Sequence, residues 1–231
     1  MIQLINRILL LIIIIFLAPI FIILGLLVLF DTKKFPIFSQ ERGLTLEKHR
    51  FRIFKFRTFK NEVVNESEID SRKILSNSHK VSQISNFGKF LRKSGLDELP
   101  QLINVLMGQM NLIGPRPLSI EDLEKIKKYY PELYFRRSRL NSKPGIIGLW
   151  QLNKDDEFSI QHLVQMDEIF ERENSLMLKT KIIIKGLKAL LIGDHRDSIV
   201  NGDKLSIYPI SVYILSIFLF ILLSLIFINL V

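Results

Sequence analysis

The sequence has no cysteine. This absence excludes thiol nucleophiles, disulfides and thiolate metal ligands, and it fits a reducing compartment. Histidine is scarce as well, and its four residues share no spacing that would predict a metal site. They are His49, His79, His162 and His195. The chain also has no internal repeat and no low-complexity tract, so it does not read as a repeat protein or a compositionally biased linker.

Charge is missing from two long stretches, residues 8–30 and 207–231. Each exceeds the roughly 20 apolar residues that a helix needs to cross a bilayer core. A cleaved signal peptide is the alternative for the first stretch, but it is too long for an ordinary signal, and Asp31 follows in place of a cleavage site. We therefore expect four parts: a membrane helix in residues 1–30, a polar basic domain in 31–193, a polar linker in 194–206 and a transmembrane helix in 207–231.

The first apolar stretch contains Pro19 near its centre. Proline inside a helix removes a hydrogen bond and clashes with the preceding turn. The residues allow either a kinked spanning helix or a helix-break-helix that enters and leaves through one leaflet. Arg7 before the stretch and Lys33 and Lys34 after it suit the second arrangement, with both ends in the cytoplasm.

The net charge of +9 and the pI near 9.7 indicate a partner that carries negative charge. For a membrane protein, that partner is the anionic cytoplasmic leaflet. Nucleic acid is the alternative, but the aromatics interleaved with the basic strand are Phe51, Phe54 and Phe56, which suit a core face better than a base-stacking platform. We expect no nucleic-acid partner.

Strands are predicted between residues 35 and 57, where residues 50–53 alternate polar and apolar, with a turn at residues 42–44. Helices are predicted for residues 87–93, 100–107 and 120–130, the last ended by Pro131, and one or two helices for 158–192. Residues 61–78 read as a loop or an exposed helix. Basic residues are spaced along the otherwise apolar second half of this segment, as in an amphipathic helix on a membrane surface or a helix with a solvated face. They are Lys179, Lys181, Lys185 and Lys188.

Two adjacent carboxylates, Asp97 and Glu98, stand just before the helix that Pro100 is expected to begin. With Arg92 nearby they could hold Mg²⁺ and a diphosphate together, because Mg²⁺ takes one or two carboxylates plus phosphate oxygens. An aspartate can also act as a covalent nucleophile at phosphorus. The alternative is that the two carboxylates only complement the helix dipole.

Further basic residues occur in settings that suit phosphate. Arg116 stands between Pro115 and Pro117, so its planar fork is carried on stiff backbone. Lys55 and Arg57 are predicted to share one face of a strand.

Residues 36–42, 54–58, 87–117 and 143–151, taken in this order, resemble the bacterial sugar transferase family, the monotopic polyprenol-phosphate phosphoglycosyl transferases. The most specific feature is Leu-Asp-Glu-Leu-Pro-Gln at residues 96–101 followed by Gly-Pro-Arg-Pro at 114–117. The resemblance covers about residues 8–193. It implies a membrane α+β fold that is mainly helical, with a re-entrant helix broken at Ala18-Pro19 and a small cytoplasmic catalytic domain that has a short β-hairpin and amphipathic surface helices. The transmembrane helix expected at 207–231 is an addition to that pattern.

The resemblance also implies an activity. The family moves a sugar 1-phosphate from a UDP-sugar to polyprenol (undecaprenyl) phosphate and releases UMP, as the first membrane step of a surface glycan pathway. Asp97 would be the nucleophile, Glu98 its partner, and both would hold Mg²⁺. The residues that would bind substrate are Arg92, Lys55, Arg57, Arg116 and Gln101. The site would face the cytoplasm at the bacterial inner membrane, in contact with membrane lipids, and self-association or contact with downstream glycosyltransferases is left open.

Some residues depart from the family pattern. Residues 154–156 read Lys-Asp-Asp where Gly-Arg is frequent, Ile147 stands where threonine is common, and Gln109 where an acidic residue is common. These positions surround the expected donor pocket, so the sugar is not identified. Two other functions are weighed: a membrane glycosyltransferase that moves the sugar alone and releases UDP, and a non-catalytic membrane scaffold. The intact Asp97 and Glu98 argue against the scaffold.

Overall fold

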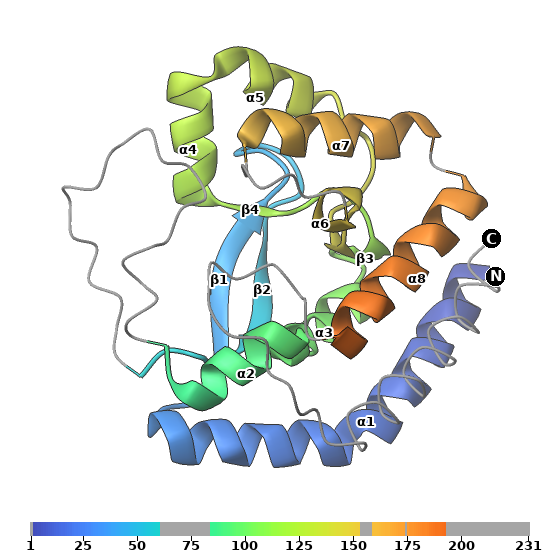
Figure 1. The fold of residues 1–231 in the computed structure, drawn as a ribbon. Helices are drawn as coiled ribbons and strands as arrows, with labels where there is room; N and C mark the ends of the chain where they lie inside the picture. Colours follow the sequence, from blue (N-terminus) through green and yellow to red (C-terminus); the bar gives the residue numbers. More distant parts are fainter. Residues whose placement is uncertain (1, 61–83, 153–158, 174, 193–231) are drawn as a thin grey trace.

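A computed structural model describes residues 2–60, 84–152, 159–173 and 175–192 (Figure 1). Within these residues the chain is mainly helical, with a small sheet between helical layers. The expected loop or helix at residues 61–78, the polar linker at 194–206 and the transmembrane helix at 207–231 lie outside the described residues.

The first helix, α1 (Ile2–Thr32), contains Pro19 and is bent in its middle (Figure 1). The bend has a physical cause, since proline removes one bond of the helical ladder. The N-terminal limb packs Leu10, Ile13 and Leu17 against Leu102. The second limb packs against other elements, placing Leu24 and Val28 in one cluster with Phe56 and Leu91. One helix therefore covers two parts of the domain.

Within α1, the segment Arg7–Thr32 is long and apolar enough to cross a membrane, and no other helix among the described residues meets that condition. Only 28% of its most apolar stretch is buried inside the protein, so most of the stretch faces outward.

The predicted hairpin is confirmed. Strand β1 (Ile37–Gly43) pairs antiparallel with β2 (Phe51–Phe56), and Phe38 lies opposite Lys55. The turn comes later than expected: β1 continues through Gly43, and residues 44–50 form the turn, in which the N–H groups of Leu44 and Thr45 donate to the Lys48 carbonyl. Strand β4 (Leu118–Ser119) joins the other edge of β1. A separate parallel pair joins β3 (Asn111–Ile113) and β5 (Gly145–Ile147).

The helices predicted at residues 87–93 and 100–107 are confirmed as α2 (Asn86–Ser94) and α3 (Gln101–Leu106). The Ser85 hydroxyl caps α2 by accepting a bond from the Gly88 N–H. The helix ends because Gly95 adopts a left-handed conformation with φ of 66°, which glycine tolerates best. Both helices pack beside α1 (Figure 1).

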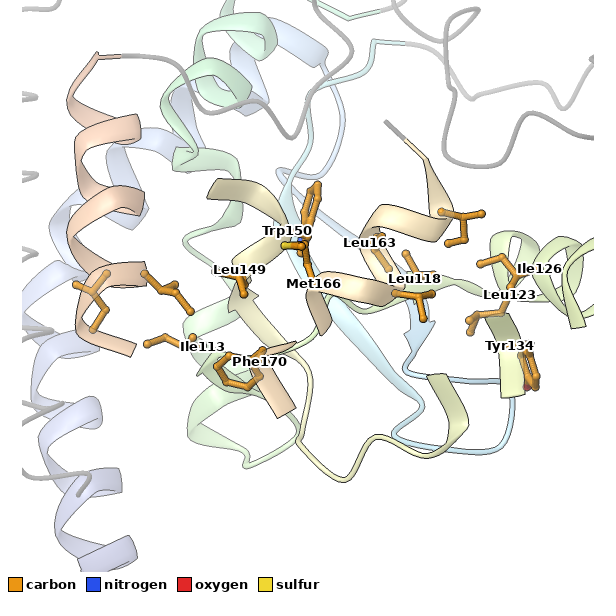
Figure 2. Packing of buried hydrophobic residues seen from close by; sticks show 14 residues of the cluster. Ile113, Leu118, Leu123, Ile126, Tyr134, Leu149, Trp150, Leu163, Met166 and Phe170 are labelled. Carbon is orange, nitrogen blue, oxygen red and sulfur yellow. The ribbon is translucent and has the colours of Figure 1, made fainter. Parts of the chain in front are cut away.

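The second half of the domain consists mostly of helices. They are α4 (Ile120–Tyr129), α5 (Pro131–Ser138), α6 (Leu149–Leu152), α7 (Ile160–Glu173) and α8 (Leu176–Ile192). Pro131 ends α4 as expected, and it also begins α5, which the sequence analysis did not predict. Strand β5 is short, because the chain turns into α6 two residues after it ends. The largest core lies between these helices and includes Trp150, Leu163 and Phe170 (Figure 2).

Candidate active site

Asp97 and Glu98 stand on a 3₁₀ turn, η2 (Leu96–Glu98), between α2 and α3. Gly95 supplies the sharp change of direction, and the turn is closed by the Glu98 N–H, which donates to the Gly95 carbonyl at 3.1 Å. The sequence placed the two carboxylates at the start of the next helix, and they stand one short turn before it. Both residues are buried, with 7% of each exposed.

Two leucines pack the acidic corner, residues 96–99, against the apolar helix α1. Leu96 and Leu99 flank the acidic pair and pack in the cluster that contains Leu24 and Val28 of α1. Leu99 also packs against the cluster that contains Leu17. The acidic pair is therefore held next to both limbs of α1.

Lys55 of β2 reaches this corner. Its Nζ donates a hydrogen bond to Glu98 Oε1 and lies 4.0 Å from Asp97 Oδ2. The side chains of Lys55, Asp97 and Glu98 are only 17%, 9% and 8% exposed. Charges act more strongly on one another in such a site than in water. The corner holds two carboxyl groups against one amino group, so it offers oxygen ligands for a cation and an oxygen nucleophile for phosphorus.

Asn104 is a further residue at this site, and its role was not predicted from the sequence. It is completely buried, and its side chain ties α3 to β2. Its Oδ1 accepts from the Phe54 N–H at 3.0 Å, and its Nδ2 donates to the Arg52 carbonyl and to Gln109 Oε1, both at 2.7 Å. Because these bonds hold the strand on both sides of residue 53, they set the position of Lys55. The sequence feature that could have indicated its role is a single asparagine among the apolar residues of this helix.

Two predicted substrate-binding arginines lie near the same end of β2. Arg92 of α2 donates through Nε to Thr58 Oγ1 at 3.0 Å and stacks 4.6 Å from the Phe59 ring centre. Arg57 donates through Nε to the Phe35 carbonyl at 2.9 Å. Gln101 is buried in the first turn of α3, directly after the acidic corner. Lys55 on β2 and Arg92 on α2 thus belong to elements that contact the turn of Asp97 and Glu98, Gln101 follows that turn in the chain, and Arg57 comes directly after β2.

Arg116 belongs to a different neighbourhood. It lies on the loop between β3 and β4, with its guanidinium 4.2 Å from the Trp150 ring centre. Strand β4 joins β1 where Leu118 pairs with Gly43, five residues from Phe38, the partner of Lys55. At the usual rise this separates Leu118 from Lys55 by about 17 Å along the strand. This is a distance between backbones, and it does not include the lengths of the Arg116 and Lys55 side chains.

Next to Arg116 is a buried ion pair. Arg137 of α5 donates to Asp167 of α7, to the Arg116 carbonyl and, at 2.7 Å, to the Leu44 carbonyl. Burial raises the pKa of Asp167 to about 6, although the Arg137 guanidinium opposes this shift. Burial likewise lowers the pKa of Arg137.

Asp97 and Glu98 supply the hard oxygen ligands that suit Mg²⁺. Among the described residues, no group of three or more histidine, aspartate or glutamate side chains could hold an ion. A magnesium ion at this corner would complete its shell with water and with oxygens of a bound phosphate, as Mg²⁺ commonly does.

The structure thus places a buried acidic pair, a lysine in contact with it and a bent apolar helix next to one another. Residues 1–193 match the model of the family described as bacterial sugar transferase. The chain belongs to this family, which confirms the resemblance found in the sequence.

Three relatives illustrate the match. Galactosyl transferase CpsE of Streptococcus agalactiae is 34% identical over 68% of this chain and 35% of its own length. Exopolysaccharide production protein ExoY of Sinorhizobium fredii is 30% identical over 76% of this chain and 79% of its own. The UDP-glucose:undecaprenyl-phosphate glucose-1-phosphate transferase of Klebsiella pneumoniae is 32% identical over 74% of this chain and 36% of its own. The chain thus spans about a third of CpsE and of the Klebsiella protein, and most of ExoY.

Proposed function

We propose that this protein is a phosphoglycosyl transferase that moves a sugar 1-phosphate from a UDP-sugar to undecaprenyl phosphate and releases UMP. The name of the Klebsiella relative contains this donor class, this acceptor and this transferred group. The observation that carries the proposal is the buried acidic corner, where Lys55 contacts Glu98 and lies near Asp97.

In the first step, an Asp97 carboxylate oxygen attacks the phosphorus that bears the sugar. A new bond forms between this oxygen and phosphorus, and the bond to the bridging oxygen of the diphosphate breaks. UMP leaves with that oxygen and the electron pair. A covalent intermediate of this kind divides one difficult transfer into two easier ones. Lys55 is suited to neutralise charge here, because its ammonium already lies within 4.0 Å of Asp97.

In the second step, a phosphate oxygen of the lipid carrier attacks the same phosphorus. The bond between phosphorus and Asp97 breaks, which restores the carboxylate and leaves a polyprenyl diphosphate sugar. Glu98, with Asp97, would hold Mg²⁺, which neutralises the phosphate oxygens when it is bound. Arg57 and Arg92 are suited to bind phosphate from the same end of β2, and Gln101 to contact substrate from the first turn of α3.

The packing of the corner supports the use of a lipid acceptor. Leu96 and Leu99 join the acidic pair to α1, the helix that is long and apolar enough for a membrane. A carrier whose tail stays among lipids can then present its phosphate at Asp97. We propose that the bent α1 enters and leaves through the cytoplasmic leaflet of the inner membrane, as Pro19 and the flanking basic residues favour. The name of the relative ExoY includes exopolysaccharide production, which fits a role of this protein in surface glycan assembly.

The test is nucleotide release by the full-length protein purified in detergent, with undecaprenyl phosphate, Mg²⁺ and either UDP-galactose or UDP-glucose. We expect UMP from the wild type and, from Asp97→Asn, a loss on the order of 10⁴-fold or more. Glu124→Gln makes the same carboxylate-to-amide change on the exposed face of α4 and should leave the rate unchanged. EDTA should abolish release. UDP in place of UMP, or full activity in Asp97→Asn, would refute the mechanism.

A further inference from the structure

The loop formed by residues 114–117 is held by donors from three other segments. The Pro115 carbonyl accepts from the Gly145 N–H at 2.9 Å, the Arg116 carbonyl accepts from Arg137, and the Pro117 carbonyl accepts from Arg42 Nη1 at 3.2 Å. Because proline has no N–H, this loop offers few donors of its own, and its conformation depends on how its carbonyls are bound. Its three successive carbonyls are all held, so the backbone of Arg116 is fixed from both sides.

Arg137 is the central donor of this arrangement. It is completely buried and donates in three directions, to the loop carbonyl, to Asp167 and to the Leu44 carbonyl. A planar guanidinium can do this, whereas a lysine ammonium at the end of a flexible stem is poorly matched to the same three acceptors. A buried ion pair is weak evidence of stability, since apolar side chains of similar volume often stabilise as much. We therefore interpret the Arg137–Asp167 pair by its effect on the loop at residues 114–117, whose Arg116 carbonyl binds Arg137.

The fixed backbone presents the Arg116 side chain in a defined way. Its guanidinium stacks 4.2 Å from the Trp150 ring centre, and Trp150 is itself buried in the core shown in Figure 2. A guanidinium held over an aromatic ring still carries the planar fork of donors that can bind a phosphate through two parallel bonds.

We propose that Arg137, Asp167 and Arg42 are positioning residues that hold Arg116 for the diphosphate of the nucleotide-sugar. Arg116 would contact the substrate, and the other three would act through it. The assignment of a diphosphate to Arg116 rests on the proposed function. A displacement of about 1 Å at a substrate-orienting group can lower a rate by 10²-fold. Weakening the hydrogen bonds that hold the Arg116 backbone should therefore lower kcat/KM, although Asp97 is unchanged.

Trp150 makes the proposal testable without turnover, because it is the only tryptophan in the chain and lies under Arg116. Its fluorescence is recorded on the full-length protein in detergent while inorganic pyrophosphate is added with Mg²⁺. We expect wild type to bind pyrophosphate with a change in emission, Arg116→Ala to lose that change, and Arg137→Lys to bind about 10-fold more weakly. Arg136→Lys is the matched control, because the neighbouring Arg136 pairs with Glu168 at the surface; it should bind like wild type.

A double-mutant cycle separates positioning from general damage. If Arg137 acts through Arg116, Arg137→Lys should lower kcat/KM about 10- to 100-fold in the wild type and less than about 2-fold in Arg116→Ala. Effects that multiply across the cycle would overturn the proposal, and so would wild-type protein that does not bind pyrophosphate. Should Arg137→Lys fail to fold, Arg42→Lys, which changes a half-buried donor, tests the same cycle. Wild-type protein that binds pyrophosphate through Arg116 but releases no UMP would reject the proposed function and leave the positioning role standing.

Discussion

The Lys55–Asp97–Glu98 group and the Arg137–Asp167 pair are both built from buried charges, but they differ in charge balance and in access to solvent. The first group has two carboxylates for one ammonium, and its side chains remain 8–17% exposed. The second has one charge of each sign, and its side chains are 0% and 1% exposed. The pair also binds two backbone carbonyls, so it is saturated within the protein.

This difference shows how buried charge can serve two purposes. An unbalanced group near the surface can still exchange partners with a cation or a phosphate, which a transfer reaction requires. A balanced and sealed pair has no such capacity, and its contribution is to fix the backbone around it. The comparison predicts that breaking the sealed pair affects folding first and breaking the open group affects turnover first.

The largest effect is expected from Arg137→Met. Removing the guanidinium leaves Asp167 buried without its partner, so we expect the free energy of unfolding to fall by about 3–5 kcal/mol. Urea unfolding followed by circular dichroism measures it. Replacing both residues, as Arg137→Met with Asp167→Leu, should restore only the part of the loss that comes from the unpaired Asp167, because the Leu44 and Arg116 carbonyls still lack the Arg137 donor. If Arg137→Met lowers the free energy of unfolding by less than about 1 kcal/mol, the Arg137–Asp167 pair does not hold the surrounding backbone.

Lys55→Met should act in the opposite way, on turnover more than on folding. It removes the ammonium beside the two carboxylates, and loss of one preorganised electrostatic group typically lowers kcat by about 10²- to 10³-fold. Lys125→Met, which breaks a surface pair with Glu121, is the control and should keep wild-type activity. UMP release and urea unfolding are measured on both. A Lys55 variant with full turnover would remove this residue from the proposed mechanism.

Asn104→Ala should have an intermediate effect on both properties. It leaves the Phe54 N–H and the Arg52 carbonyl without their side-chain partner, and an unsatisfied buried group costs about 1–3 kcal/mol. Because Lys55 follows Phe54 in the strand, turnover should also fall. Asn104→Asp keeps the acceptor for the Phe54 N–H but places a carboxylate against two oxygen acceptors in a fully buried site, so it should be at least as destabilising as Asn104→Ala. Urea unfolding of Asn104→Ala with a wild-type midpoint would show that these bonds contribute nothing to stability.

The smallest effect is expected at an exposed carboxylate. Hydrogen bonds from Lys127 and then from Tyr134 lower the pKa of Glu47 from its ordinary 4.5 to about 2. A lowered pKa means that this carboxylate stabilises the fold above pH 4.5 and that the contribution is lost as the pH falls towards 2. Glu47→Gln should therefore have a lower Tm than wild type at pH 6, and the difference should disappear near pH 2. A difference that is constant with pH would contradict this account.

Much of the fold could be predicted from local patterns. Alternation in residues 50–53 indicated a strand that became part of β2, and Pro100 marked the start of α3 within one residue. The end of β1 was misplaced because Gly43 looked like a turn residue, whereas its pairing with Leu118 keeps it in the sheet. Helix α5 was missed because Pro131 was interpreted as an end, and proline equally begins a helix.

Some residues of the candidate site could likewise be predicted from local sequence, and others could not. The acidic pair was evident from the order of residues 96–101, since adjacent carboxylates need no folding to be neighbours. Asn104 was not, because an asparagine in an apolar helix has no assigned partner until the helix meets a strand.

By itself the sequence determined the apolar helix with its proline bend, the acidic corner and the family, because apolar runs, turn residues and short motifs are local. Only the tertiary structure decided which charges meet. Lys55 and Glu98 lie 43 positions apart, and Arg137 and Asp167 lie 30 apart. Such contacts depend on how whole helices and strands pack, and the free energy of that packing comes from apolar surfaces spread along the entire chain. No local pattern contains that information, so the partners of buried charges appear only in the folded molecule.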